Sequence, residues 1–328
     1  MKNKVNYQKV CQELLFDLPQ RQKEIISRRF GLEGAQKETL ESIGQDFGVS
    51  RERIRQIQEV ATEKIKSKLD KYQKIFQSFS EYLQKCGHLK KEEILLADLG
   101  GENFKNEVSF LLTLKKPFQK LGKNDDFYSL WLTNFNSFEL AKKVINSLFN
   151  QLQTIETPLS FGQFNPPLYL ERDALQSYLE ISKKIQKNEE GLYGLKDWPE
   201  INPRGIKDKA YLVFKKIGKP LHFSKVANLI ENAHLQTVHN ELIKDSRFVL
   251  IGRGIYALSE WGYYPGEVKE VIFKILKEAK KPLEKKEILK KVLSQRLVKE
   301  NTVLLNLSNK KYFEKNSQGK YTPKTQTI

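Results

Sequence analysis

Apolar residues recur at the spacing of an α-helix near the start of the chain. Residues 18–32 carry one apolar stripe, made of Ile25, Ile26 and Phe30. Pro19 stands where a helix can begin, and Gly31 stands where one can end. We therefore predict a helix between these two residues.

Two further helices are predicted directly after it. Thr39 is a good N-cap for a second helix whose stripe is Leu40, Ile43 and Phe47. Gly48 ends that helix, and Ser50 caps a third one. A short helix, a glycine-containing turn and a longer helix are the layout of a helix-turn-helix.

The third helix has two faces of different chemistry. Its apolar face consists of Ile54, Ile57, Ala61 and Ile65. Its opposite face consists of Arg51, Glu52, Arg55, Gln56 and Glu59. Arg, Gln and Glu are side chains that can recognise base edges in the major groove of DNA. An ordinary solvated helix face has the same pattern, so the periodicity leaves both interpretations open.

Residues 18–65 resemble region 4 of the sigma-70 family. The resemblance rests on Arg28-Arg29-Phe30-Gly31-Leu32, Thr39-Leu40-Glu41, Ile43-Gly44 and the run from Val49 to Ile57. It implies a unit that reads the upstream promoter hexamer and docks on the flap of RNA polymerase. It further implies base contacts by Arg51, Glu52, Arg55 and Gln56, with Arg53 nearer the DNA backbone. Only 17 residues precede Leu18, so we do not expect this chain to melt a promoter as complete sigma factors do.

Two signals repeat along the rest of the chain. Tyrosines in short segments that contain Gly, Trp or both are spaced by 65, 63 and 65 residues: Tyr128, Tyr193, Tyr256 and Tyr321. Leucines, three of them after proline, are spaced by 70, 62 and 62 residues: Leu89, Leu159, Leu221 and Leu283. Two signals with one period indicate a tandem repeat whose first copy is degenerate.

Each copy predicts helices followed by a β-hairpin, which is the pattern of a winged helix. In the third copy the hairpin strands are residues 248–251 and 255–258, joined by a turn at residues 252–254. We expect a mainly α fold of tandem helix-turn-helix and winged-helix units with small β-hairpin wings. The predicted domains are residues 1–70, 71–133, 134–202, 203–264 and 265–328, and the last four are called the first to fourth repeats below.

Residues 206–261 resemble the HARE-type helix-turn-helix, a winged helix. The carriers are Gly218-Lys219-Pro220-Leu221-His222, Arg247-Phe248 and the run from Gly254 to Leu258. The resemblance implies a module associated with nucleic acid or polymerase. Candidate DNA contacts in this repeat are Thr237, His239, Asn240, Lys244, Arg247 and Arg253. A polar helix surface would contain the same residue types.

The charge of the chain is uneven, and this favours a polyanionic partner. The formal net charge is +17, and residues 203–328 alone carry 26 basic and 12 acidic residues. Residues 71–202 carry 17 of each, so the middle of the chain is a neutral spacer or a protein-binding part.

Several kinds of chemistry are not expected. Cys11 and Cys86 lie far apart without a CxxC partner, which argues against a zinc site or a disulfide and fits a reducing bacterial cytoplasm. The sequence shows no signal peptide, membrane span or phosphate-binding GxxxxGK[ST] loop. Asp245, Glu267 and Lys269 only faintly resemble a nuclease triad, since the last two are predicted to open a helix. We therefore expect no enzyme, cofactor, metal, membrane or small-molecule substrate.

The sequence thus predicts a sequence-specific DNA-binding transcription protein. Its expected partners are promoter-like double-stranded DNA and the core of bacterial RNA polymerase, in the cytoplasm on the nucleoid. Two alternatives stay open at this point. One is an architectural protein that coats DNA without sequence preference, and the other is a polymerase-binding adaptor that does not read DNA.

Overall fold

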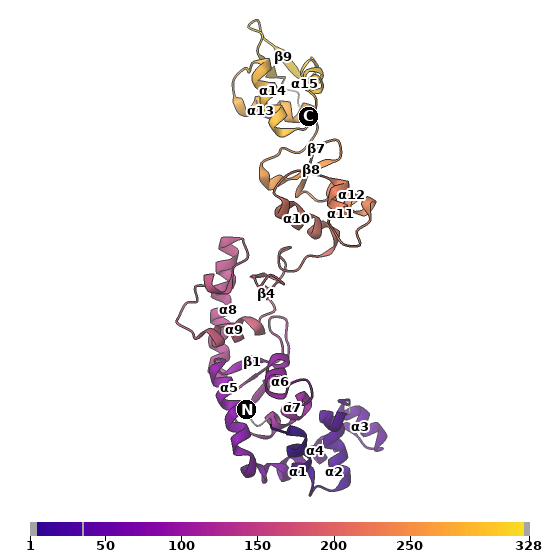
Figure 1. Cartoon of the computed structure of the whole chain (residues 1–328), viewed down its shortest axis with the longest axis vertical. Coiled ribbons are helices and arrows are strands. Elements are labelled where there is room, and N and C mark those ends of the chain that lie inside the picture. The colour runs from indigo at the N-terminus through magenta and orange to yellow at the C-terminus, as the bar shows by residue number, and fades with distance from the viewer. Residues whose placement is uncertain (1–4, 35, 325–328) are drawn as a thin grey trace. The chain divides into compact units, whose positions relative to one another are not determined.

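The computed structural model describes residues 5–34 and 36–324, and the fold is mainly α with small antiparallel strand pairs. The chain divides into two compact units, residues 1–196 and 197–328 (Figure 1). Unit 1 begins with α1 (Tyr7–Leu15), α2 (Gln20–Phe30), η1 (Leu32–Gly34), α3 (Leu40–Asp46), α4 (Arg51–Lys66) and η2 (Leu69–Tyr72). It continues with α5 (Gln73–Lys85), β1 (Leu89–Lys91), α6 (Glu92–Gly100), α7 (Lys105–Leu114), β2 (Gln119–Leu121) and β3 (Leu130–Leu132). It ends with α8 (Phe135–Ile155), η3 (Phe161–Gln163), α9 (Arg172–Ile181), β4 (Ile185–Lys187) and β5 (Tyr193–Leu195).

Unit 2 contains the two C-terminal repeats. The third repeat has α10 (Gly205–Ile217), β6 (Leu221–His222), α11 (Phe223–Asn228), α12 (Leu235–Lys244), β7 (Phe248–Gly252), β8 (Ile255–Leu258) and η4 (Ser259–Trp261). The fourth has α13 (Val268–Ala279), α14 (Lys285–Gln295), α15 (Glu300–Leu307), β9 (Phe313–Lys315) and β10 (Tyr321–Pro323). The hairpin predicted in the third repeat is confirmed.

The four repeats share one order of elements. A long helix comes first, a short extended segment follows, and one or two helices then lead to a strand pair. The first and third repeats form three-stranded sheets of the same topology, β1-β3-β2 and β6-β8-β7, in which the earliest strand pairs with the last. The second and fourth repeats keep only the hairpin as regular strands, β4-β5 and β10-β9.

The two repeating sequence signals meet in three of the four repeats. Leu159 pairs with Tyr193, Leu221 with Tyr256, and Leu283 with Tyr321 in antiparallel bridges. The period is therefore the spacing of one hydrogen-bonded contact between the extended leucine and the last strand.

The first repeat differs at the tyrosine. Leu89 pairs with Leu132, four residues beyond Tyr128. The amide of Tyr128 instead donates to Ile181 O at 3.0 Å, in the second repeat. The first repeat thus keeps the pairing between its extended leucine and its last strand, whereas its tyrosine contacts the second repeat.

A second recurring pattern consists of buried positions on the helix before each hairpin and in the hairpin itself. Two apolar residues four apart on this helix, and one six residues later in the first hairpin segment, are buried in every repeat. The sets are Val108, Leu112 and Phe118; Leu175, Leu179 and Ile185; Val238, Leu242 and Phe248; Val303, Leu307 and Phe313. The four helices α7, α9, α12 and α15 therefore sit on equivalent cores, and we call each the last helix of its repeat.

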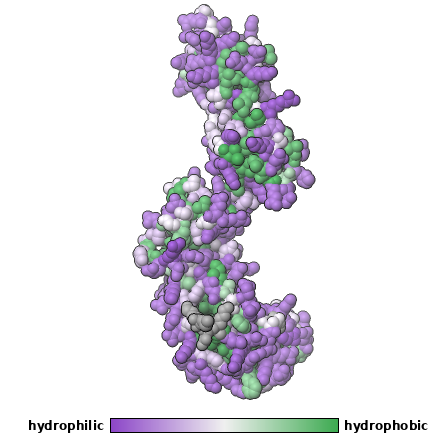
Figure 2. All heavy atoms as spheres, viewed as in Figure 1, coloured by the Kyte–Doolittle hydropathy of each residue, from purple (hydrophilic) through white to green (hydrophobic). Residues whose placement is uncertain are grey.

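The N-terminal helices and the first repeat share one hydrophobic core. Tyr7 and Leu14 of α1, Ile26 of α2 and Ile65 of α4 belong to the same buried cluster as Phe110 of α7. The boundary predicted at residue 70 lies within this stretch of shared packing. On the face that Figure 2 displays, the surface of the protein is largely hydrophilic. The finer division into five domains stays a prediction.

Candidate nucleic-acid interface

The predicted helix-turn-helix is formed by α2, α3 and α4, with the predicted caps in place. Pro19 precedes α2, and Gly31 ends it in a left-handed conformation. The Thr39 side chain accepts from the Ser42 amide at 3.1 Å, and the Ser50 hydroxyl accepts from the Arg53 amide at 3.2 Å. These bonds satisfy amide groups that a helix start otherwise leaves unpaired.

The turn between α3 and α4 depends on two glycines. Gly48 has a φ of 64°, which a residue without a side chain adopts readily. A Cβ on Gly44 would lie 2.7 Å from the carbonyl oxygen of Val49. The backbone of the turn therefore passes closely over α3, and this fixes the direction in which α4 leaves it.

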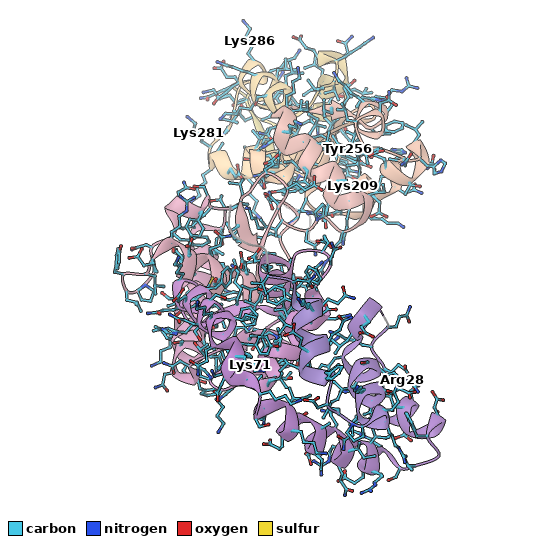
Figure 3. All side chains as sticks on the ribbon, turned by 60° about the horizontal axis from the view of Figure 1, so that its bottom comes forward. Arg28, Lys71, Lys209, Tyr256, Lys281 and Lys286 are labelled. Carbon is cyan, nitrogen blue, oxygen red and sulfur yellow. The ribbon has the colours of Figure 1, made fainter. Side chains whose placement is uncertain are left out.

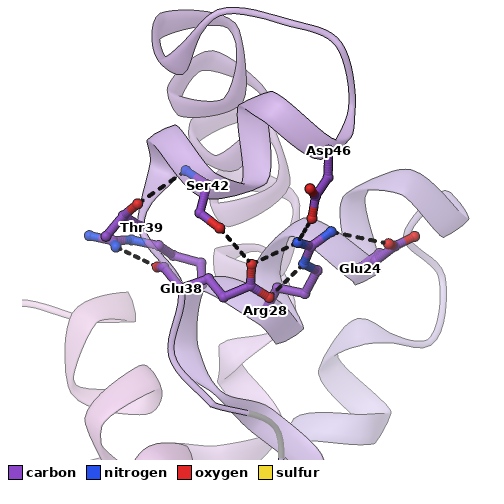
Figure 4. Close-up of polar contacts among 7 residues, drawn as sticks. Glu24, Arg28, Glu38, Thr39, Ser42 and Asp46 are labelled. Atoms are coloured by element: carbon purple, nitrogen blue, oxygen red, sulfur yellow. Dashed lines mark hydrogen bonds and ion pairs between the residues drawn. The ribbon is translucent and has the colours of Figure 1, made fainter.

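Arg28 of α2 joins its helix to α3 and to the loop before α3 by charge. It donates from Nε and Nη2 to the two carboxylate oxygens of Glu38, both at 2.7 Å, and it also pairs with Asp46 of α3. Figure 4 shows these contacts, together with Glu24 on α2 and the Ser42 hydroxyl that donates to Glu38. The hydrogen bonds from Arg28 lower the pKa of Glu38, so this carboxyl stays charged at neutral pH. The motif residues named by the resemblance thus include one, Arg28, whose role is to hold the frame together.

The predicted reading face of α4 is exposed. Ile54, Ala61 and Ile65 are buried beneath the helix and Ile57 is half-buried. The side chains expected to contact DNA all reach solvent: Arg51, Glu52, Arg53, Arg55 and Gln56. The predicted division of α4 into a core face and a polar face is therefore confirmed.

The polar groups on α4 contact one another. Arg55 donates to both carboxylate oxygens of Glu52, at 2.9 and 2.6 Å, and also pairs with Glu59. Arg53 Nη1 donates to Gln56 Oε1 at 3.2 Å. The hydrogen bonds from Arg55 lower the pKa of Glu52. Since these pairs are exposed, exchanging them for DNA groups costs little.

The second group of predicted contacts lies in unit 2 and divides into two kinds. Thr237, Asn240 and Lys244 are exposed on α12, and Arg253 is exposed in the hairpin turn. The two remaining residues are engaged inside the repeat. The His239 ring stacks on Phe223, with ring centroids 4.2 Å apart.

Arg247 is the second of these engaged residues. Its Nη2 contacts Asp208 at 2.8 Å and Asp245 at 2.6 Å, and its guanidinium lies 4.9 Å from the ring centre of Tyr211. The hydrogen bonds from Arg247 lower the pKa of Asp245. Arg247 is therefore the shared counter-charge of two shielded carboxylates within the third repeat.

The described residues offer little for metal or membrane chemistry. Among residues 5–34 and 36–324, no group of three His, Cys, Asp or Glu side chains could hold a metal ion. Burial raises the pKa of the Cys11 thiol, which keeps that thiol protonated at neutral pH. No helix in the same ranges has the length and apolar character that crossing a bilayer requires.

Sequence reasoning did not foresee what covers the last helices of the first two repeats. Phe110 of α7 lies on Phe30 of α2, and Asn106 Nδ2 donates to Gly31 O at 2.7 Å. On α9, Tyr178 Oη donates to Gly87 O at 3.3 Å, and Glu180 pairs with Lys90 at 2.7 Å. One sequence signal for this covering was available: the apolar Phe110 occupies the position that the polar Asn240 has in the third repeat.

Comparison with known proteins places one family in the N-terminal part. Residues 14–67 match the model of Sigma-70, region 4. Over 56 residues the chain is 46% identical to RNA polymerase sigma factor sigB of Arabidopsis thaliana. These residues make up 17% of this chain and 10% of that protein. Over 55 residues it is 42% identical to RNA polymerase sigma factor SigA of a Bacillus species. These residues make up 17% of this chain and 15% of that protein.

The chain thus aligns with only a small fraction of these curated relatives. The matched segment contains α2, α3 and α4, the elements that carry the exposed polar face and its supporting ion pairs. Residues 14–67 therefore form a Sigma-70 region 4 domain, which supports a DNA-binding role in transcription initiation for this part of the chain.

Proposed function

We propose that this protein binds promoter-like double-stranded DNA through α4 and regulates transcription initiation together with the core of bacterial RNA polymerase. It acts by recruitment or modulation, without catalysis, in the cytoplasm at the nucleoid. The observation that carries the proposal is the exposed face of Arg51, Glu52, Arg53, Arg55 and Gln56 on the second helix of the turn, within a region 4 domain.

The geometry of α4 supports base contacts. Its N-terminal end holds the polar side chains, while the rest of the helix is anchored by Ala61 and Ile65 in the core. A helix presented in this way can enter the major groove with its first turns toward the bases. Arg and Gln then have the donors and acceptors to recognise guanine and adenine.

We further propose that the four repeats are winged-helix units, with the third of the HARE type and with boundaries as predicted from the sequence. The common order of elements and the identical topology of the two three-stranded sheets support this. In the third repeat, Thr237, Asn240, Lys244 and Arg253 are the exposed members of the proposed contact set. A second tethered contact raises the affinity through effective concentration.

The test is selection of bound sequences from random duplexes at about physiological salt. The variant carries Arg55→Ala and Gln56→Ala, which remove two proposed base contacts. The matched control carries Lys64→Ala and Lys66→Ala, two exposed residues at the other end of the same helix. We expect the wild type and the control to select the same motif, and the variant to lose it.

Three results would overturn the proposal. If the wild type selects no motif, the protein does not read sequence, and an architectural role replaces the proposed one. If the variant keeps the motif, α4 is not the reading element. If neither protein binds duplexes and both capture polymerase, the protein is an adaptor.

A further inference from the structure

The last helices of the four repeats have different surroundings on their outer faces. The residue midway between the two buried positions points away from the core of the repeat, because it lies about 180° around the helix from them. This residue is Phe110, Ser177, Asn240 and Leu305 in the four repeats. The first two are fully buried by other parts of unit 1, whereas Asn240 is exposed and Leu305 is 74% exposed.

The last helices of the first and second repeats are therefore used to hold unit 1 together. The neutral charge of residues 71–202 agrees with this use, since protein contacts need no excess of either sign. A surface for a polyanion must be sought elsewhere. The fourth repeat has the largest excess, with 16 basic and 7 acidic residues between positions 265 and 328.

The outer face of α15 has no hydrogen-bonding side chain at its centre. Its centre is Leu305, where α12 has Asn240. An exposed leucine can neither donate to a base edge nor accept from one. A leucine cannot pair with phosphate oxygens either, so charged contacts of the fourth repeat with DNA come from another part of its surface.

A basic hollow lies between the end of α15 and the hairpin β9-β10. It has a volume of about 400 Å³, and its lining includes Lys310, Lys315 and Lys324. Glu314 is the one carboxylate in this lining. Among the described residues, none of the three ammonium groups has an ion pair with a carboxylate, and Lys315 lies 5.9 Å from the ring centre of Tyr321.

A hollow beside α1 shows that converging lysines are not sufficient. Lys9, Lys68 and Lys71 line it together with Glu13 and Asp17. Lys68 is already paired with Asp17 at 2.5 Å. The hollow in the fourth repeat differs because its three lysines face one carboxylate, and among the described residues none of the three is held in an ion pair.

We propose that this hollow, lined by Lys310, Lys315 and Lys324, binds the phosphate backbone of duplex DNA without reading its sequence. The proposal rests on the proposed DNA-binding function and adds a second site in unit 2. Lys310 lies between α15 and β9, Lys315 ends β9 and Lys324 follows β10. Ammonium groups act on phosphates as point charges, which requires no base-specific geometry. The hollow supplies affinity and α4 supplies sequence preference.

The experiment measures the affinity of the full chain for a duplex at several salt concentrations. The variant carries Lys310→Gln, Lys315→Gln and Lys324→Gln. The control carries Lys281→Gln, Lys285→Gln and Lys286→Gln, which removes the same charge from exposed lysines of the same repeat. Figure 3 shows Lys281 and Lys286 extending away from the ribbon.

Each phosphate contact contributes a slope of ~0.9 to the dependence of log affinity on log salt. We expect the hollow variant to lower this slope by about one to three, to weaken binding equally for all sequences, and to keep the selected motif. The control is expected to change the slope by less than about half as much. Equal changes in the two variants, or no change in the hollow variant, would overturn the proposal.

Protection of the lysines from acetylation distinguishes duplex DNA from other anionic ligands. Duplex DNA is expected to protect Lys310, Lys315 and Lys324 from an amine-reactive reagent, whereas inorganic phosphate at equal ionic strength and polyglutamate are not. Protection by either of the latter would replace DNA with a free anion or an acidic protein as the ligand. A wild type that selects a motif while its hollow lysines stay unprotected would overturn this inference and leave the proposed function intact.

Discussion

The rings of Phe30 and Phe110 lie 4.9 Å apart, and they join the region 4 domain to the first repeat. Phe30 is the last residue of α2, and Phe110 lies in the middle of α7. The same contact region includes the bond from Asn106 to the carbonyl of Gly31, which ends α2. The frame of the helix-turn-helix is thus supported from outside the 54 residues that match the family model.

Replacing Phe110 by alanine should destabilise the region 4 domain and the first repeat together. Removing a buried phenyl group typically costs ~3–5 kcal/mol in the free energy of unfolding. Because Phe110 lies between α2 and α7, we expect denaturant unfolding to show this loss and duplex binding by α4 to weaken with it. The control is Phe16→Ala, whose ring is 76% exposed and whose loss should cost less than ~0.5 kcal/mol. Unchanged unfolding of Phe110→Ala would contradict the burial of this ring, and a destabilised protein with unchanged duplex binding would show that the contact does not support the region 4 domain.

The elements of the region 4 domain could be predicted because their signals are local. Thr39 and Ser50 cap helices, and Gly31 ends one, through contacts with residues a few positions away. The pairing of Leu283 with Tyr321 could be anticipated only as a repeat spacing, since hydrogen bonding across 38 residues leaves no local signature. The burial of Phe110 was not predictable, because an apolar residue on an outer helix face does not identify its partner.

Replacing Gly44 by alanine should distort the turn of the region 4 domain. The added Cβ would lie 2.7 Å from the carbonyl oxygen of Val49, and this backbone atom cannot move without displacing the start of α4. We expect a loss of ~1–3 kcal/mol in unfolding free energy and weaker duplex binding. The control is Gly162→Ala, where the added Cβ would meet no atom within 4 Å beyond its local backbone and chain neighbours, and stability should stay equal or rise by up to ~1 kcal/mol. Equal behaviour of the two variants would contradict the close approach.

Replacing Arg28 by lysine should weaken the frame without changing the motif that is read. A lysine cannot donate two parallel hydrogen bonds to Glu38 while also reaching Asp46. We expect the thermal midpoint to fall by roughly 2–8 °C and the affinity for the selected duplex to fall with it. Arg21→Lys is the control, since Arg21 is exposed and its guanidinium contacts only the ring face of Phe47 among the interactions described. A changed motif in Arg28→Lys would mean that Arg28 itself contacts DNA.

The site could be predicted in part for the same physical reason as the fold. The exposed face of α4 follows from helical periodicity, so Arg51 and Arg55 were placed correctly on the surface. The engagement of Arg247 by Asp208 was not predictable, because 39 residues separate them. An arginine near a hairpin has the same sequence signature whether it contacts a carboxylate or a phosphate.

Replacing Arg247 by methionine should make the stability of unit 2 depend differently on pH. Asp245 and Asp208 are shielded, with side chains 15% and 10% exposed, and they lose their counter-charge in this variant. At neutral pH we therefore expect a lower thermal midpoint than in the wild type. Because Arg247 lowers the pKa of Asp245 in the folded state, this stabilisation is complete above the ordinary aspartate pKa of about 4 and is lost as the pH falls through the lowered value.

The measurement is thermal unfolding of the wild type and Arg247→Met from pH 7 down to about pH 3. The difference in midpoint should be largest at neutral pH and should shrink below about pH 4, where a protonated carboxyl no longer needs a counter-charge. Lys215→Met serves as the control, since Lys215 pairs with the more exposed Glu260 at 2.9 Å and should change the midpoint little. A difference between wild type and Arg247→Met that stays constant over this range would show that the variant acts by lost packing on Tyr211 and not by lost charge.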